Sequence, residues 1–257
     1  MFSDSAENTC MKILVLSLVS ISLWSCAKNS FQSAINLPNS NSNSGSNTGS
    51  STPVVSNPPV DPTAYKAVPL AWESKVSGSN AWSKYIYNYI KTSEPQMLGQ
   101  NVADDIETFC PKYRSLSDDQ RSNFWGQLFA GIAKFESGWK PTSRMVETTM
   151  GTDPITGRQV ASEGLLQLSY QDEGSYRLDC GFDWSKDKNL TDADPKKTIL
   201  DPYNNLKCGI SIMAKQLKNK RAIALSSNVY WAVLKINGKY TKITEIAAVT
   251  KQLPFCN

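Results

Sequence analysis

The chain has 257 residues, with 27 basic and 23 acidic side chains, a formal net charge of +4 and no histidine. Its length fits one medium-sized domain with additional segments. The lack of histidine excludes Ser-His-Asp and Cys-His catalysis and the HExxH zinc site. Any catalysis must therefore depend on carboxylate, lysine or tyrosine side chains.

Residues 1–26 predict a signal segment for export. Lys12 precedes an apolar run, residues 13–23, that is too short to span a bilayer as a helix. Acidic residues weaken a signal that begins at residue 1, so we expect translation to start at Met11. The sequence Leu-Trp-Ser-Cys26 resembles a lipobox and predicts an acylated Cys26, although a small-residue cleavage site also fits. The expected location is the periplasm, the outer membrane as a lipoprotein, or the medium after secretion.

Residues 27–63 are rich in Ser, Asn and Gly and then in Pro, with little to bury, which predicts a disordered linker. The remaining residues, 64–257, suffice for one domain with a substantial core. An even number of cysteines in an exported domain predicts two disulfides, with three pairings open. No CxxC zinc pattern occurs among them: Cys110, Cys180, Cys208 and Cys256.

Two helices are predicted in the first half of this domain. Residues 80–93 carry large apolar side chains at helical spacing, which we interpret as core, with sugar stacking as the alternative. In the second, Ser117 and Gln120 form a capping box. Apolar residues then recur every four positions at Phe124, Leu128 and Ile132, and Gly138 ends the helix.

Glu136 is the next member of that apolar series, in the last turn of the helix. Burial and the negative end of the helix dipole both disfavour its anion and raise its pKa, as a general acid near neutral pH requires. Cleaving a glycosidic bond is the commonest reaction that carboxylates perform alone. The alternative is a solvated glutamate at a helix end.

A hairpin of two strands and three helices are predicted towards the C-terminus. Residues 144–162 form two short strands around a turn at 152–157. A helix begins at Asp201-Pro202 and runs to about Leu217. Asn228 caps a helix over residues 229–236, and a last helix spans about 242–252.

Two segments resemble motifs of soluble lytic transglycosylases and goose-type lysozymes. Glu136-Ser137-Gly138 resembles their Glu-Ser motif, and Gly164-Leu165-Leu166-Gln167 resembles their Gly-Leu-Met-Gln motif, with Leu in place of Met. The resemblance covers about residues 115–236. It implies an α+β, predominantly α-helical, lysozyme-like fold with a small β-hairpin beside the cleft, and neither metal nor cofactor.

The resemblance also implies roles in cleaving the β-1,4 bond between N-acetylmuramic acid and N-acetylglucosamine of peptidoglycan. Glu136 would protonate the glycosidic oxygen, Ser137 would position the sugar, and Gln167 would hydrogen-bond it. The third family motif is altered, because Lys235 and Ile236 stand where Tyr and Asn belong. Tyr170 or Tyr230 would supply a ring from elsewhere.

The reaction and the sugar stay open. Hydrolysis would use a second carboxylate to activate water, whereas a lytic transglycosylase would use the muramic acid 6-hydroxyl. An acidic rim of Glu163, Asp172 and Glu173 would favour a deacetylated, cationic sugar. The candidates for the second carboxylate are those three with Glu147 and Asp153.

The expected partners are peptidoglycan glycan strands. The lysines are scattered and form no basic stripe, so nucleic-acid binding is not expected. We expect a monomer. The alternative of another class is a catalytically inactive peptidoglycan-binding lipoprotein on a lysozyme scaffold, which the altered third motif favours.

Overall fold

The computed structural model describes residues 65–257. The predicted signal segment, the Cys26 anchor and the linker lie outside these residues. In the described part, seven α-helices accompany one two-stranded sheet: α1 (Asn80–Ser93), α2 (Ile106–Phe109), α3 (Asp118–Glu136), β1 (Arg144–Val146), β2 (Ala161–Glu163), α4 (Asp172–Tyr176), α5 (Trp184–Asp187), α6 (Pro202–Lys220) and α7 (Ile243–Thr250). Short 3-10 turns lie at Pro95–Leu98, Tyr113–Ser115, Thr198–Leu200, Ala232–Leu234 and Pro254–Cys256.

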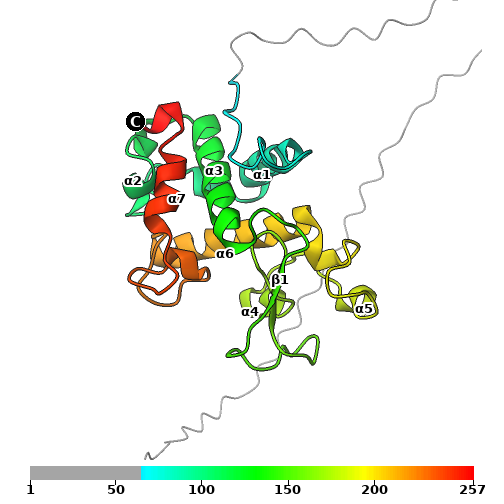
Figure 1. Cartoon of the computed structure of the whole chain (residues 1–257). Helices are drawn as coiled ribbons and strands as arrows, with labels where there is room; N and C mark the ends of the chain where they lie inside the picture. The colour runs from blue at the N-terminus through cyan, green and yellow to red at the C-terminus, as the bar shows by residue number, and fades with distance from the viewer. Residues whose placement is uncertain (1–64) are drawn as a thin grey trace, which may run out of the picture. The chain divides into compact units, whose positions relative to one another are not determined.

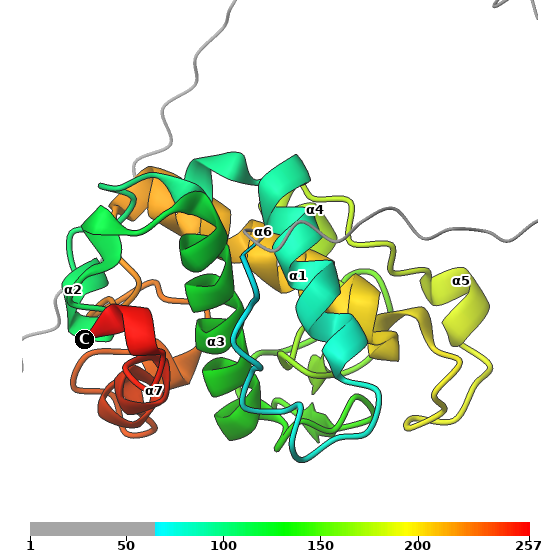
Figure 2. The same cartoon turned by 90° about the horizontal axis from the view of Figure 1, so that it is seen from above.

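Helix α3 is the centre of the helical part. It packs between α7 and α1, and α1 in turn packs on α6 (Figures 1 and 2). The predicted stripe of Phe124, Leu128 and Ile132 is fully buried, but burial extends around the helix from Arg121 to Ala133. The hairpin, α4 and α5 form a smaller part beside the C-terminal end of α3 (Figure 1).

The two long helices begin where local sequence signals place them. The Ser117 hydroxyl accepts from the Gln120 backbone N–H, and the Gln120 side chain accepts from the Ser117 N–H, so the capping box is confirmed. Asp201 accepts from the first two free N–H groups of α6. Helix α6 continues to Lys220, beyond the predicted end at Leu217.

Helix α1 confirms the prediction for residues 80–93. Trp82, Ile86 and Ile90 are buried in the core, whereas Tyr85 and Tyr89 are half-buried and stack on each other with ring centroids 5.8 Å apart. Apolar spacing therefore identified the buried face of this helix.

The hairpin is also as predicted. Strands β1 and β2 are antiparallel, with Arg144 opposite Glu163 and Val146 opposite Ala161. The intervening turn is held by the N–H of Asp153, which donates to the Arg158 carbonyl at 2.8 Å. A mostly helical chain with this small sheet confirms the predicted α+β class.

The predicted helix over residues 229–236 is wrong. Only a 3-10 turn forms there, and Asn228 has a left-handed φ of 54° instead of a capping conformation. The Trp231 indole donates to the Leu166 carbonyl at 2.9 Å, and Ile236 N–H donates to the Leu225 carbonyl at 2.8 Å. These tertiary bonds replace the intrahelical ones that the prediction required.

The four cysteines of residues 65–257 form two disulfides, Cys110–Cys256 and Cys180–Cys208, one of the three open pairings. Such bridges indicate an oxidising compartment, in agreement with export. Among the helices of residues 65–257, none has the length and apolar character needed to cross a membrane.

Candidate active site

Glu136 lies at the last position of α3, half-buried at the surface of a cleft. Helix α3 ends there because Gly138 adopts a left-handed φ of 60°. The Oε1 atom of Glu136 is buried and has no hydrogen-bond partner within the described residues. Glu136 is therefore not the solvated helix-end residue of the alternative interpretation.

The surroundings of Glu136 favour its neutral form. Burial raises its pKa from the ordinary 4.5 to about 7, and the negative charge of Glu147 adds to the effect. At this pKa the carboxyl group is protonated in about half of the molecules at neutral pH, which suits a general acid.

The hairpin forms the opposite wall of the cleft. Side chains at alternate strand positions point to opposite faces of a sheet. Glu147 and Ser162 point to the face that lines the cleft, and the Ser162 hydroxyl donates to Glu147 Oε1 at 2.6 Å. Glu147 is thus a candidate second carboxylate that lines the cleft with Glu136, is held by a neighbour, and acts on the Glu136 carboxyl through its charge.

The Gly-Leu-Leu-Gln segment forms the floor between the helix and the hairpin. Gly164 has a φ of 83°, and a Cβ atom there would lie 2.2 Å from Asn205 Nδ2, so only glycine fits. Gln167 lines the cleft, with its amide nitrogen donating to the carbonyls of Gly164 at 2.9 Å and Ser143 at 3.3 Å. The second motif therefore lies beside Glu136, as the sequence predicted.

Ser137 has a different position from the one expected. Its side chain is buried, and its hydroxyl donates to the carbonyls of Ala133 at 3.1 Å and Leu165 at 2.8 Å. It is not among the residues that line the cleft. Ser137 joins the end of α3 to the Gly-Leu-Leu-Gln segment and so places the two motifs relative to each other.

Tyr230 is one of the aromatic residues that line the cleft. Its hydroxyl donates to Asp172 Oδ2 at 2.5 Å, and Asp172 also accepts from the Ser169 N–H at 2.7 Å. Burial raises the pKa of Asp172, while the Tyr230 hydrogen bond opposes that rise. The ring of Tyr230 packs edge-on against Tyr176, with centroids 5.8 Å apart.

The cleft has a volume of about 530 Å³. Three carboxylates line it (Glu136, Glu147 and Asp172), whereas no lysine or arginine of the described chain does so. Two aromatic lining residues (Tyr176 and Tyr240) had no recognisable signal in the sequence, since no motif contains them, whereas Trp231 begins the segment that matches the altered third motif. Within residues 65–257, no group of three His, Cys, Asp or Glu side chains is placed to hold a metal ion.

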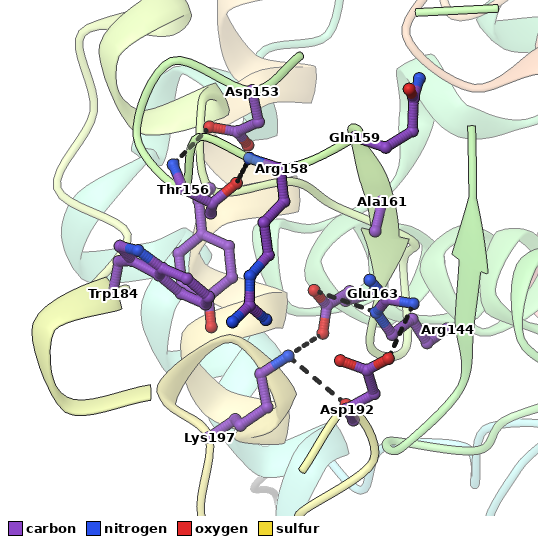
Figure 3. Close-up of a pocket in the computed structure, with 11 residues that line it drawn as sticks. Arg144, Asp153, Thr156, Arg158, Gln159, Ala161, Glu163, Trp184, Asp192 and Lys197 are labelled. Carbon is purple, nitrogen blue, oxygen red and sulfur yellow. Dashed lines mark hydrogen bonds and ion pairs between the residues drawn. The ribbon is translucent and has the colours of Figure 1, made fainter. Parts of the chain in front are cut away.

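Glu163 and Tyr170 do not lie in this cleft, which corrects two sequence predictions. Glu163 points to the other face of the hairpin, where its buried carboxylate pairs with Lys197 and with Arg144, the latter at 3.6 Å (Figure 3). Tyr170 is buried on the same side and donates to Asp187 at 2.7 Å. Both side chains therefore stabilise the fold around the hairpin.

Two other predicted carboxylates accept hydrogen bonds from backbone N–H groups. Asp153 is buried and accepts from the N–H groups of Ile155 at 2.8 Å and Gln171 at 3.1 Å. Glu173 accepts from the N–H groups of Cys180 at 2.8 Å and Phe182 at 3.0 Å. Neither lines the cleft. Of the predicted acidic rim, only Asp172 remains.

Comparisons with known proteins give a small, consistent set of matches. No protein-family model and no curated protein sequence matches the chain. The solved structure of wild-type DslA is 31% identical with a TM-score of 0.62, covering 75% of this chain and 100% of that one. Two DslA variants, each with one glutamate changed to glutamine, are 30% identical, with TM-scores of 0.62 and 0.59. The chain therefore belongs to the same family as DslA.

Proposed function

We propose that this protein cleaves the β-1,4 glycosidic bond between N-acetylmuramic acid and N-acetylglucosamine in peptidoglycan, with Glu136 as the general acid. The observation that carries the proposal is the buried Glu136 Oε1 without a hydrogen-bond partner, on a carboxyl whose pKa is raised to about 7. It lines a cleft large enough for a sugar chain. The two disulfides support export to where that polymer lies.

Hydrolysis of the lysozyme type is the form of the reaction that Glu147 supports. Glu136 donates its proton to the glycosidic oxygen, and Glu147 accepts a proton from the water that attacks the anomeric carbon. The spacing of the DslA variants is a second support. Their two substituted glutamates lie eleven positions apart, as Glu136 and Glu147 do here.

Gln167 and Tyr230 are the proposed sugar contacts, since both line the cleft beside Glu136. Ser137 is a positioning residue and not a sugar contact. Its hydroxyl donates to the Leu165 carbonyl and so holds the end of α3, with Glu136, against the Gly-Leu-Leu-Gln segment. Tyr230 takes the place of the tyrosine that the altered third motif lacks.

The test is digestion of sacculi by the full-length protein, with mass spectrometry of the released fragments. Glu136→Gln and Glu147→Gln are compared with wild type, and Glu245→Gln, exposed on α7, is the matched control. Loss of general acid catalysis lowers the rate by about 10²-fold to 10⁴-fold for Glu136→Gln, and the control retains full activity. Wild-type activity falls as the pH rises through about 7, where Glu136 loses its proton.

The ends of the fragments decide between the reactions. Reducing ends support hydrolysis, whereas anhydro ends would show a lytic transglycosylase and remove the role of Glu147 as base. If wild type released no fragment from any substrate, the inactive peptidoglycan-binding alternative would replace the enzyme.

A preference for N-deacetylated peptidoglycan is a finer part of the proposal. Glu147 and Asp172 line the cleft, where the described part of the chain places no lysine or arginine, and such a lining attracts the ammonium group of a glucosamine residue. Sacculi with native and with chemically removed acetyl groups test it. Equal rates on both would refute the preference and leave the bond cleavage intact.

A further inference from the structure

A second pocket, of about 310 Å³, adjoins the cleft. The two share Ser175, Tyr176 and Tyr230, so the edge-on pair of tyrosine rings forms the partition between them. The C-terminal half of α6 forms the opposite wall of this second pocket. A ligand that fills the cleft thus has a lateral space beside it.

The charges of the two cavities are opposite. The second pocket is lined by Arg177, Lys215 and Lys220 and by no carboxylate of the described chain, and we name it the basic pocket. The cleft has three carboxylates and, among residues 65–257, no lysine or arginine in its lining. Because the two cavities adjoin, an extended ligand that enters both meets negative potential in one and positive potential in the other.

Two of the three cations are available for a ligand. Lys215 is engaged, since its ammonium group donates to the carbonyls of Tyr176 and Arg177 at the end of α4. Arg177 and Lys220 are exposed and form no ion pair among residues 65–257. A guanidinium group beside an ammonium group is suited to carboxylates, which arginine binds through two parallel hydrogen bonds.

The wall of the basic pocket is held in place from within the fold. The Gln216 side chain donates to the carbonyls of Ala222 at 3.0 Å and Ile223 at 2.8 Å, which fixes the chain after α6. The bond from Lys215 fixes the backbone of Arg177 on the other side. The pocket is therefore preformed between two anchored segments.

We propose that the basic pocket binds the carboxylates of the stem peptide, which muramic acid carries through its lactyl group, while the glycan strand lies in the cleft. This inference rests on the proposed function. The stem peptide is the anionic substituent of the strand, and the carboxylates of the cleft repel it towards Arg177 and Lys220. The substrate class is thus a peptide-bearing glycan in preference to a bare one.

The experiment compares peptide-bearing glycan strands with the same strands after an amidase has removed the stem peptides. The full-length variant Arg177→Gln with Lys220→Gln is measured on both at subsaturating concentration. The charge-matched control is Lys84→Gln with Lys188→Gln, two exposed lysines that line neither cavity. Thermal melting confirms that each variant is folded.

The expected result is a loss of about fivefold in kcat/KM for the pocket variant on peptide-bearing strands, because two exposed ion pairs are lost. Its rate on bare strands stays at the wild-type value, and the control matches wild type on both. Equal rates of pocket variant and wild type on peptide-bearing strands would overturn the inference and leave the proposed function standing. A loss of equal size on bare strands would also overturn it, since it would reflect general charge attraction. No cleavage by wild type would remove both proposals.

Discussion

The carboxyl group of Glu136 is placed where its charged form is disfavoured. Its Oε1 is buried without a partner, and burial together with Glu147 raises its pKa to about 7. In the unfolded chain the same group has its ordinary pKa, 4.5. Between these two pH values the folded protein binds a proton that the unfolded chain has released, so stability falls as the pH rises.

Replacement of Glu136 by Gln therefore stabilises the fold in a pH-dependent way. We expect a gain on the order of 2 kcal/mol at pH 8, where wild type holds a buried charge, and little gain at pH 4, where both proteins are neutral at this site. Urea unfolding at the two pH values measures it. A gain of the same size at both pH values would show that the site does not disfavour the charge.

The sequence predicted individual residues of the candidate site correctly only where those residues belong to a motif. Glu136 and Gln167 lie together in the cleft as their motifs indicated. Glu163 does not lie in the cleft, because neighbouring residues of a strand point to opposite faces of the sheet. The face could not be predicted, since the fourteen-residue connection between β1 and β2 allows more than one strand register. Once Glu147 lines the cleft with Ser162, Glu163 must point away.

At the scale of elements, the two faces of the hairpin place their carboxylates in different environments. One face carries Glu147 into the cleft, and the other carries Glu163 into buried ion pairs with Lys197 and Arg144 (Figure 3). Lys197 is itself buried. A buried pair depends on both partners, because removal of one leaves the other charge in the interior uncompensated.

Replacement of Lys197 by Met therefore destabilises the protein by about 3 kcal/mol. Replacing Glu163 by Gln in the same chain removes a buried charge that has lost its closer partner and keeps only Arg144, at 3.6 Å, so the double variant is more stable than Lys197→Met alone. Urea unfolding of the two single variants and the double variant measures the coupling. Additive losses would show that Glu163 and Lys197 do not act as a pair.

The sequence predicted the elements whose signals are local. Helices α3 and α6 have side-chain caps and regular apolar spacing, and both begin where predicted. Residues 229–236 have similar spacing, but Trp231 donates to Leu166 far away in the chain and the helix does not form. The short helices α2, α4 and α5 were not predicted, since four or five residues are too few to show a periodic pattern.

At the scale of the whole molecule, the two disulfides close loops of very different size. Cys110 and Cys256 are 146 positions apart, whereas Cys180 and Cys208 are 28 apart. Cross-linking lowers the entropy of the unfolded chain more when the closed loop is longer. The short bridge instead joins α6 to the segment after α4.

Removal of each bridge by paired Cys→Ser substitutions separates these roles. We expect losses of about 5 kcal/mol for Cys110–Cys256 and about 3.5 kcal/mol for Cys180–Cys208 from the loop lengths. Guanidinium unfolding gives the order of stability. A smaller loss for the long bridge than for the short one would contradict loop closure as the source of stability.

The long bridge also changes what a protease can do to the molecule. Cys110 precedes and Cys256 follows every residue that lines the cleft, so residues 110–256 form a covalent ring that contains the whole cleft. One cut inside a ring opens it but releases no piece. A protein nicked once in this region keeps both sides of its cleft attached, and a second cut is needed before any part of the site can diffuse away.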